Sequence, residues 1–222
     1  IEEWLAEVIR KNSGLNPLIV RTKLKEVLQD SMLEFVYNDP AYRAFLFTGG
    51  TCLHRLYGLP RLSEDLGFDT EEAVDAHAFA ADAQSYIQRS LHYSPARTKV
   101  SGNGTSVTLM FPVLKHLGLV RNSADSPNLF LRCDLAHDQI GLYGDQRLPL
   151  STGKIMFFVR AYTLSTLFGN KLAAFIGRAY QKGATQTVPF KGRDVFDLVW
   201  FLQESQQIGR AHRLNSSHSQ QY

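Results

Sequence analysis

A glycine turn followed by a hydroxyl residue is the first group in this chain that could bind a ligand. Gly49, Gly50 and Thr51 come directly after the apolar run 45–47. Glycines let a backbone approach a phosphate closely, and a helix beginning at Thr51 would direct free N–H groups and its positive dipole end at an anion. Taken alone, the turn favours a plain strand-to-helix junction with Thr51 as N-cap. A phosphate cradle is predicted only together with the residues that follow.

Carboxylates stand on the next apolar run. Asp65, Gly67 and Asp69 alternate with Leu66 and Phe68. In a strand the first three share one face, while the two apolar side chains point into a core. Carboxylates at a strand end beside a phosphate cradle suit Mg²⁺, which takes a few carboxylates together with phosphate oxygens. The alternative is solvated acids at a strand edge.

A third carboxylate, Asp134, lies in the hydrophobic run 129–135. This position predicts the end of a strand within a sheet, where Asp134 could meet Asp65 from a neighbouring strand. A strand-capping acid without catalytic function fits Asp134 about equally well.

Two charged groups lie on predicted helices further along the chain. Lys171 interrupts the apolar run 167–175, and Asp194 and Asp197 lie one helical turn apart just after Arg193. Lys171 could neutralise a triphosphate, or it could be a surface lysine with a buried stem. Acids in a first helical turn are favoured by the helix dipole in any case, so the second group could be a structural cap.

Hydrophobic periodicity indicates which elements would position these residues. Helices are predicted over 2–12, 17–37, 51–57, 75–92, 163–180 and 191–205. Strands are predicted over 45–47, within 61–69, and over 105–113, 129–135 and 155–162. The predicted fold class is therefore α/β (α+β), with a small mixed sheet, flanking helices and a helical C-terminal part. It lacks the alternation of a doubly wound sheet, and neither GxGxxG nor a Walker loop is present.

Composition narrows the class of protein without naming a function. The chain has 222 residues and a formal net charge of +3, which permits a nucleic-acid partner without requiring one. Its apolar runs are shorter than a membrane span. Cys52 and Cys133 fit a reducing compartment without a disulfide framework, so we expect a cytoplasmic protein that does not contact a membrane.

The chain divides into three parts on pattern alone. We expect an α/β domain with N-terminal helices over 1–160 and a truncated helical part over 161–207. Residues 208–222 lose the hydrophobic period and look like a translated sequencing adaptor more than a natural polar tail. Because the sequence starts at Ile1 without Met, we also expect the natural N-terminus to be missing.

Together the motifs resemble those of the AbiEii/AbiGii (MenT-type) toxins of the nucleotidyltransferase superfamily. The family's Gly-Gly-Thr/Ser turn, its Arg-x-Ser-x-Asp-Leu/Ile-Asp-Phe motif, its Lys-x-Asp motif, its helical lysine and its Arg-Asp-x-x-Asp-Leu motif occur here in order. They match residues 49–51, 61–68, 132–135 (with Arg in place of Lys), 171–174 and 193–198.

The resemblance implies a nucleotidyltransferase-type core and toxin activity in a toxin–antitoxin pair, often linked to phage defence. It implies use of a nucleoside triphosphate (NTP) with Mg²⁺, a cognate antitoxin, and RNA as acceptor, with the tRNA 3′ end as leading candidate. The implied catalytic residues are Asp65, Asp134, Lys171 and Asp194. The implied nucleotide-binding residues are Gly49, Gly50, Thr51, Ser63, Lys171 and Arg193. The implied metal ligands are Asp65 and Asp134, and we add Asp69 as a candidate ligand because it shares the strand face of Asp65.

One position departs from the family pattern: Gly67 stands where the second catalytic aspartate is expected. Asp69 could replace it, but Asp69 lies about 6.6–6.8 Å further along a strand. The chain could instead be a slow or inactive member, or Gly67 could be a sequence error or an inactivating change. We expect impaired activity ahead of rescue by Asp69.

Two other functions stay open at this point. The first is a catalytically degenerate relative that only binds nucleotide or RNA, which Gly67 favours. The second is a nucleotidyltransferase that modifies a small molecule, against which the motifs at 171–174 and 193–198 argue.

Overall fold

The computed structural model describes residues 1–101, 103–120, 122, 125–137, 143–152, 154–177, 180–182, 186–188 and 191–204. The chain divides into two compact units, Ile1–Thr163 and Leu164–Tyr222. The predicted tail over 208–222 lies outside the described residues.

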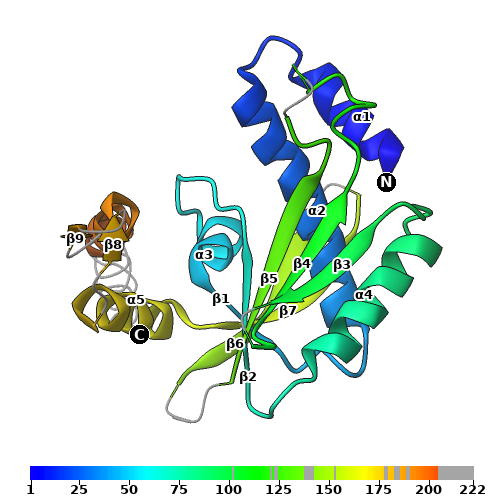
Figure 1. Cartoon of the computed structure of the whole chain (residues 1–222). Coiled ribbons are helices and arrows are strands. Elements are labelled where there is room, and N and C mark those ends of the chain that lie inside the picture. The colour runs from blue at the N-terminus through cyan, green and yellow to red at the C-terminus, as the bar shows by residue number, and fades with distance from the viewer. Residues whose placement is uncertain are drawn as a thin grey trace, which may run out of the picture. The chain divides into compact units, whose positions relative to one another are not determined.

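The first unit contains four helices and seven strands in its described part (Figure 1). The helices are α1 (Glu2–Lys11), α2 (Pro17–Asn38), α3 (Gly49–Tyr57) and α4 (Ala76–Arg89). The strands are β1 (Leu46–Thr48), β2 (Leu66–Thr70), β3 (Arg97–Ser101), β4 (Ser106–Phe111), β5 (Leu129–His137), β6 (Asp145–Ser151) and β7 (Met156–Tyr162).

These strands form one mixed sheet in the order β3-β4-β5-β2-β1-β7-β6. β2 runs parallel to β5 and β1 runs parallel to β7, while the other neighbours are antiparallel. The predicted mixed α/β fold is confirmed. The two outermost strands, β3 and β6, were not predicted, because edge strands tolerate polar residues and proline. β3 reads RTKVS and β6 carries Pro149.

Helices α2, α3 and α4 pack on one face of this sheet. α2 contacts β5 and β7, α3 contacts β1 and β2, and α4 contacts β3 and β4, and Figure 1 shows α2 and α4 lying along the strands. The sheet side chains that face these helices are buried: Phe47, Leu66, Phe68, Val107, Leu109, Leu131, Cys133, Val159 and Ala161. The opposite face, called the open face below, holds the alternate residues, of which Phe130 and Phe158 are exposed.

α2 begins with two sequence signals that fix its start. Asn16 accepts a hydrogen bond from the backbone N–H of Leu18 at 2.9 Å, which satisfies one of the free donors of the first turn. Pro17 follows at the first helical position, where its missing N–H costs nothing. Ten of the residues of α2 are buried, so this helix is the centre of the core.

Polar side chains tie α3 to α2. The Arg55 guanidinium pairs with Asp30, and both side chains are 17 % exposed. The pairing with Asp30 turns the Arg55 guanidinium toward the interface between the two helices. Nε2 of His54 lies 3.3 Å from Oε1 of Glu26. Burial raises the pKa of the Asp30 carboxyl to about 6, against the opposing effect of the Arg55 guanidinium.

The second unit contains helix α5 (Leu164–Gly177), the short strands β8 (Tyr180–Lys182) and β9 (Gln186–Val188), and a helical segment over 192–204. Strand β8 begins where the sequence predicted the last turn of a helix. Within the described ranges of both units, none of the helices is long and apolar enough to cross a membrane.

Removing the Arg55 side chain should destabilise the first unit. Arg55→Ala leaves the carboxylate of Asp30 largely buried without its counter-charge, which we expect to lower the free energy of unfolding by roughly 3 kcal/mol. Urea denaturation followed by far-UV circular dichroism measures this loss. The double variant Arg55→Leu/Asp30→Leu should recover most of it, and a double variant as unstable as Arg55→Ala would contradict this account.

Candidate active site

The parallel pairing of β2 with β5 brings two of the predicted carboxylates together. Leu66 is opposite Cys133, and Gly67 is opposite Asp134. Asp65 directly precedes β2 and therefore lies beside β5, close to Asp134. Desolvation, followed by the negative charge of Asp134, raises the pKa of the Asp65 carboxyl above its usual range. The predicted meeting of Asp65 and Asp134 is thus present in the structure.

Two cations oppose this accumulation of negative charge. The Nε of Arg132 donates to Oδ1 of Asp134 at 2.6 Å, and both side chains are about half exposed, at 54 % and 44 %. Lys25 of α2 pairs with Glu64 at 2.5 Å. The charges of Lys25 and Arg132 both lower the pKa of Asp65 in part. The site is therefore a carboxylate pair edged by cations, a distribution suited to a substrate that brings both phosphate and metal.

Gly67 leaves a gap in the carboxylate arrangement. A Cβ at position 67 would lie 3.3 Å from both the Cγ2 and the carbonyl oxygen of Thr48, so a side chain fits there only if Thr48 shifts by a few tenths of an ångström. Asp69 is opposite Ala136 instead of Asp134. Asp69 thus shares the face of Gly67 but stands one strand repeat further from the pair.

The carboxylates of the site could hold one Mg²⁺ ion only with the help of further ligands. Among the described residues, no three His, Cys, Asp or Glu side chains gather closely enough to hold a metal on their own. Mg²⁺ is commonly held by one or two carboxylates while substrate phosphates and water complete its shell. Asp65 and Asp134 meet that requirement for one ion, and the assignment of Asp69 as a ligand stays a prediction.

The glycine turn builds a cradle beside the carboxylates. Gly49 adopts φ +81°, a left-handed conformation that favours glycine. A Cβ on Gly50 would lie 2.9 Å from an Arg61 guanidinium nitrogen and 2.9 Å from Oγ of Ser63. The absence of a side chain at position 50 therefore lets a guanidinium and a hydroxyl lie over the first turn of α3, where backbone N–H groups already favour anions.

Thr51 has a different role from the one predicted for its hydroxyl. Its side chain is fully buried, and Oγ1 donates to the carbonyl oxygen of Asp65 at 2.5 Å. Gln29 of α2 donates to the carbonyl oxygen of Ser63 at 2.8 Å. These two bonds fix the segment 63–65 against α2 and α3, so Thr51 positions Asp65 and can offer a ligand only its backbone N–H.

The second unit holds the remaining predicted residues. Nζ of Lys171 on α5 lies 2.7 Å from Oδ2 of Asp197, whose side chain is fully buried. Arg193 is exposed and Asp194 is partly exposed at the start of the 192–204 helix. The backbone N–H of Asp194 donates to the carbonyl oxygen of Lys191 at 2.9 Å. The ion pair gives Lys171 a structural partner, while the catalytic and nucleotide-binding assignments of Lys171, Arg193 and Asp194 stay predictions.

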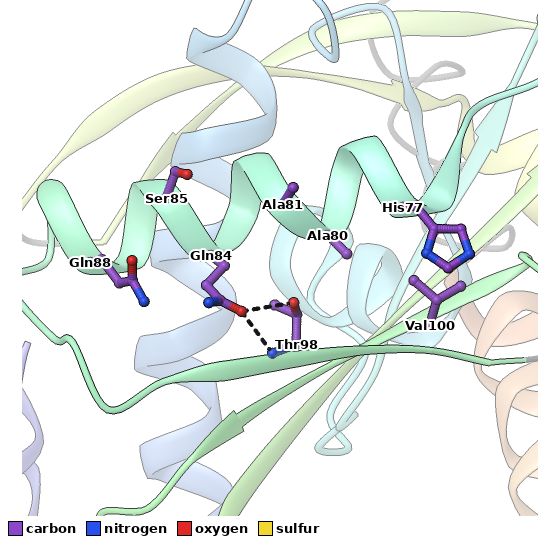
Figure 2. Close-up of a pocket in the computed structure, with 8 residues that line it drawn as sticks. All are labelled: His77, Ala80, Ala81, Gln84, Ser85, Gln88, Thr98 and Val100. Carbon is purple, nitrogen blue, oxygen red and sulfur yellow. Dashed lines mark hydrogen bonds between the residues drawn. The ribbon is translucent and has the colours of Figure 1, made fainter.

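A cavity elsewhere in the first unit lies apart from this chemistry. A hollow of about 440 Å³ lies between α4 and the edge strand β3, and Figure 2 shows the side chains that line it. Oε1 of Gln84 accepts hydrogen bonds from the backbone N–H and the hydroxyl of Thr98, at 3.2 and 3.0 Å. Its lining is neutral apart from His77 and consists of His77, Ala80, Ala81, Gln84, Ser85, Gln88, Thr98 and Val100. Without a carboxylate, it does not suit a metal-bound triphosphate.

The sequence placed Arg132 and Asp197 in motifs but did not predict their ion pairs, and it did not single out Lys25. Arg132 stands two residues before Asp134 and so shares its strand face, a signal that period-two alternation offered. Lys25 and Asp197 are different, because their partners lie far away in the sequence and only the fold brings them together.

Carboxylates on adjoining strands, beside a glycine turn that opens a helix, define a nucleotidyltransferase-type core. The family model described as nucleotidyl transferase AbiEii toxin, type IV toxin–antitoxin system, matches residues 34–218. The chain belongs to this AbiEii toxin family, and the resemblance found in its motifs is confirmed.

Two solved structures that match this chain come from Helicobacter pylori. JHP933 is 19 % identical with a TM-score of 0.47, over 82 % of this chain and 66 % of that one. A candidate nucleotidyltransferase is 18 % identical with a TM-score of 0.48, over 81 % of this chain and 67 % of that one. The chain thus spans about two thirds of the length of these proteins. Curated protein sequences gave no match.

Neutralising Asp65 should stabilise the protein at neutral pH. Because the folded-state pKa of Asp65 is raised above the ordinary value of 3.8, the folded state binds this proton more tightly than the unfolded state. Stability therefore falls as pH rises from 3.8 through the folded pKa. We expect Asp65→Asn to have a higher melting temperature than wild type at pH 7, with the difference vanishing below pH 3.8. The exposed acid Glu72 supplies the control Glu72→Gln, and an equal gain from that variant would contradict the explanation.

Lys171→Met should destabilise the second unit whether or not Lys171 is catalytic. The variant removes the Lys171 ammonium from the buried carboxylate of Asp197, which we expect to cost roughly 3–5 kcal/mol. Lys171→Arg keeps a cation and should lose much less. Thermal unfolding of both variants measures the difference, and similar melting temperatures for wild type and Lys171→Met would show that the ion pair contributes little.

Proposed function

We propose that this chain transfers a nucleoside monophosphate from an NTP to the 3′ hydroxyl of RNA, with the tRNA 3′ end as the leading acceptor. The observation that carries the proposal is the Asp65–Asp134 pair beside the cradle of Gly50, Arg61 and Ser63. A cognate antitoxin and a role in phage defence are part of the same proposal, on the strength of the family.

The chemistry assigns a role to each residue of the first unit. The RNA 3′ oxygen attacks the α-phosphorus of the NTP, the bond between that phosphorus and the α,β-bridging oxygen breaks, and pyrophosphate leaves. Asp134 accepts the proton of the attacking hydroxyl as a general base. Backbone N–H groups of Gly50 and Thr51, with the Arg61 guanidinium and the Ser63 hydroxyl, bind the β- and γ-phosphates.

The family motifs assign roles to three residues of the second unit. Lys171 would neutralise negative charge on the leaving pyrophosphate, in addition to its pairing with Asp197. Arg193 and Asp194 would brace the site or contact the nucleotide. These three roles rest on the family motifs they match.

Asp65 and Asp134 would hold Mg²⁺ in this proposal. When bound, the ion would supply charge neutralisation for the triphosphate. Burial, followed by the charge of Asp134, raises the pKa of Asp65, and a bound cation would offset both effects, which favours the same conclusion.

Gly67 favours a second candidate function, in which the chain binds nucleotide and RNA without transferring the nucleotide efficiently. The position opposite Asp134 lacks a carboxylate, and Asp69 stands one strand repeat away. We therefore expect the wild-type chain to bind nucleotide and RNA but to transfer the nucleotide slowly.

Restoring the carboxylate tests this proposal. Purified chain is incubated with Mg²⁺, each labelled NTP in turn and total RNA, and label on RNA is counted after electrophoresis. Gly67→Asp should raise the rate by at least roughly 10- to 100-fold, because even the outer-shell groups that support a metal site change activity by about that factor. Combining it with Thr48→Ser removes the Cγ2 contact at 3.3 Å and should raise the rate at least as far.

Gly67→Asn is the matched control, because it adds the same bulk without the charge and should give no gain. Efficient labelling of RNA by wild type, with no increase from Gly67→Asp, would show that Gly67 does not impair catalysis. Label found only on a small acceptor, in any variant, would overturn the RNA assignment.

A further inference from the structure

The open face of the sheet carries a basic surface next to the carboxylate pair. Strand register places Lys99 of β3 opposite Thr108 of β4, and Thr108 opposite Arg132 of β5. Residues directly opposite in a sheet share a face, and Arg132 shares its face with Asp134 two residues further on. Lys99, Arg132 and Asp134 are therefore on one continuous surface.

A second row of the same register adds an aromatic ring. Arg97 is opposite Met110, and Met110 is opposite Phe130. The Arg97 guanidinium donates to the carbonyl oxygens of Ser94 and Ala96 at 3.0 and 2.8 Å, which hold it at the outer edge of the sheet. We call the set Arg97, Lys99, Phe130 and Arg132 the basic face.

Burial shows that the basic face presents its side chains to solvent. Arg97 and Lys99 are exposed, the Arg132 side chain is 54 % exposed and Phe130 is 40 % exposed. On the other side of the same strands Leu109, Leu131 and Cys133 are fully buried. Exposing the Phe130 ring to water is unfavourable. Aromatic rings among cations are the combination with which proteins bind single-stranded nucleic acid.

The strand order separates this surface from the nucleotide cradle. The cradle opens at α3, which contacts β1 and β2, whereas the basic face runs from β5 out to β3. Asp65 and Asp134 therefore stand between them in the sheet. Phosphoryl transfer needs the attacking and leaving oxygens roughly in line, so a triphosphate on the α3 side leaves the β3 side for the acceptor.

We propose that the basic face binds the single-stranded 3′ end of the RNA acceptor and leads its hydroxyl to Asp134. Arg97, Lys99 and Arg132 contact successive phosphates, and Phe130 stacks on an unpaired base. Neighbouring strands are about 4.8 Å apart, so Lys99 and Arg132 are about 10 Å apart at the backbone, a span that the extended backbone of a short single strand can bridge. This inference rests on the proposed function and names the substrate-binding surface of the same site.

Binding of a short single-stranded RNA with a free 3′ hydroxyl tests the proposal. Fluorescence anisotropy gives the dissociation constant at several salt concentrations. In Arg97→Gln/Lys99→Gln the constant should rise at least tenfold, and the slope of its logarithm against log salt should fall by about 1.4, that is, about 0.7 for each lost phosphate contact. Phe130→Ala should weaken binding roughly 5- to 100-fold with little change in slope.

Arg43→Gln/Lys115→Gln is the matched control. Arg43 and Lys115 are exposed and lie outside the strands, so the control removes the same charge and should leave binding unchanged. Melting temperatures of all variants check folding, which we expect to be unaffected. Binding of labelled NTP should also be unchanged in every variant.

The proposal is overturned if the control loses as much RNA affinity as the test variant, or if neither loses any. It is also overturned if NTP binding falls in parallel with RNA binding, because the residues would then serve the nucleotide, or if blunt duplex RNA binds as tightly as the single strand. If RNA binding follows the expected pattern but neither wild type nor Gly67→Asp transfers label, the basic face stands and the proposed transfer reaction fails.

Discussion

The parallel pairing of β2 with β5 is the constraint on which this structure depends. It places Asp65 beside Asp134, and the desolvation and mutual repulsion of these carboxylates raise the pKa of Asp65. Hydrogen bonds from the uncharged side chains of Thr51 and Gln29 to backbone carbonyl oxygens of the segment before β2 hold this unfavourable charge in place. Burial of Leu66, Phe68, Leu131 and Cys133 on the opposite face stabilises the pairing, so an apolar core supports a polar site.

The glycines at positions 50 and 67 have opposite consequences for that site. At position 50 the missing side chain creates room that Arg61 and Ser63 occupy, so the glycine adds ligands to the cradle. At position 67 the missing side chain removes a carboxylate from the row that contains Asp134. Membership of the AbiEii family therefore coexists with a site in which the proposed phosphate cradle has more potential ligands than the proposed metal site.

Much of this arrangement could be predicted from sequence, and the reasons are physical. Strands β1, β4, β5 and β7 are apolar enough to be read from alternation or continuous burial, and the glycine turn marks the start of α3. Strands β3 and β6 were not predicted because edge strands need little apolar surface. The approach of Asp65 to Asp134 could be expected because each lies in a run of residues with the pattern of a strand. The pairings of Arg55 with Asp30 and of Lys171 with Asp197 could not, because they depend on how helices pack.

The separation of Asp65 and Asp134 along the chain has a consequence for synthesis. Contacts between distant segments form only after the intervening chain has been made and its loop-closure entropy has been overcome. The carboxylate pair therefore cannot assemble on a ribosome until β5 has emerged, although the cradle at α3 is made much earlier. The candidate site of a nascent chain is therefore completed only together with the centre of its sheet.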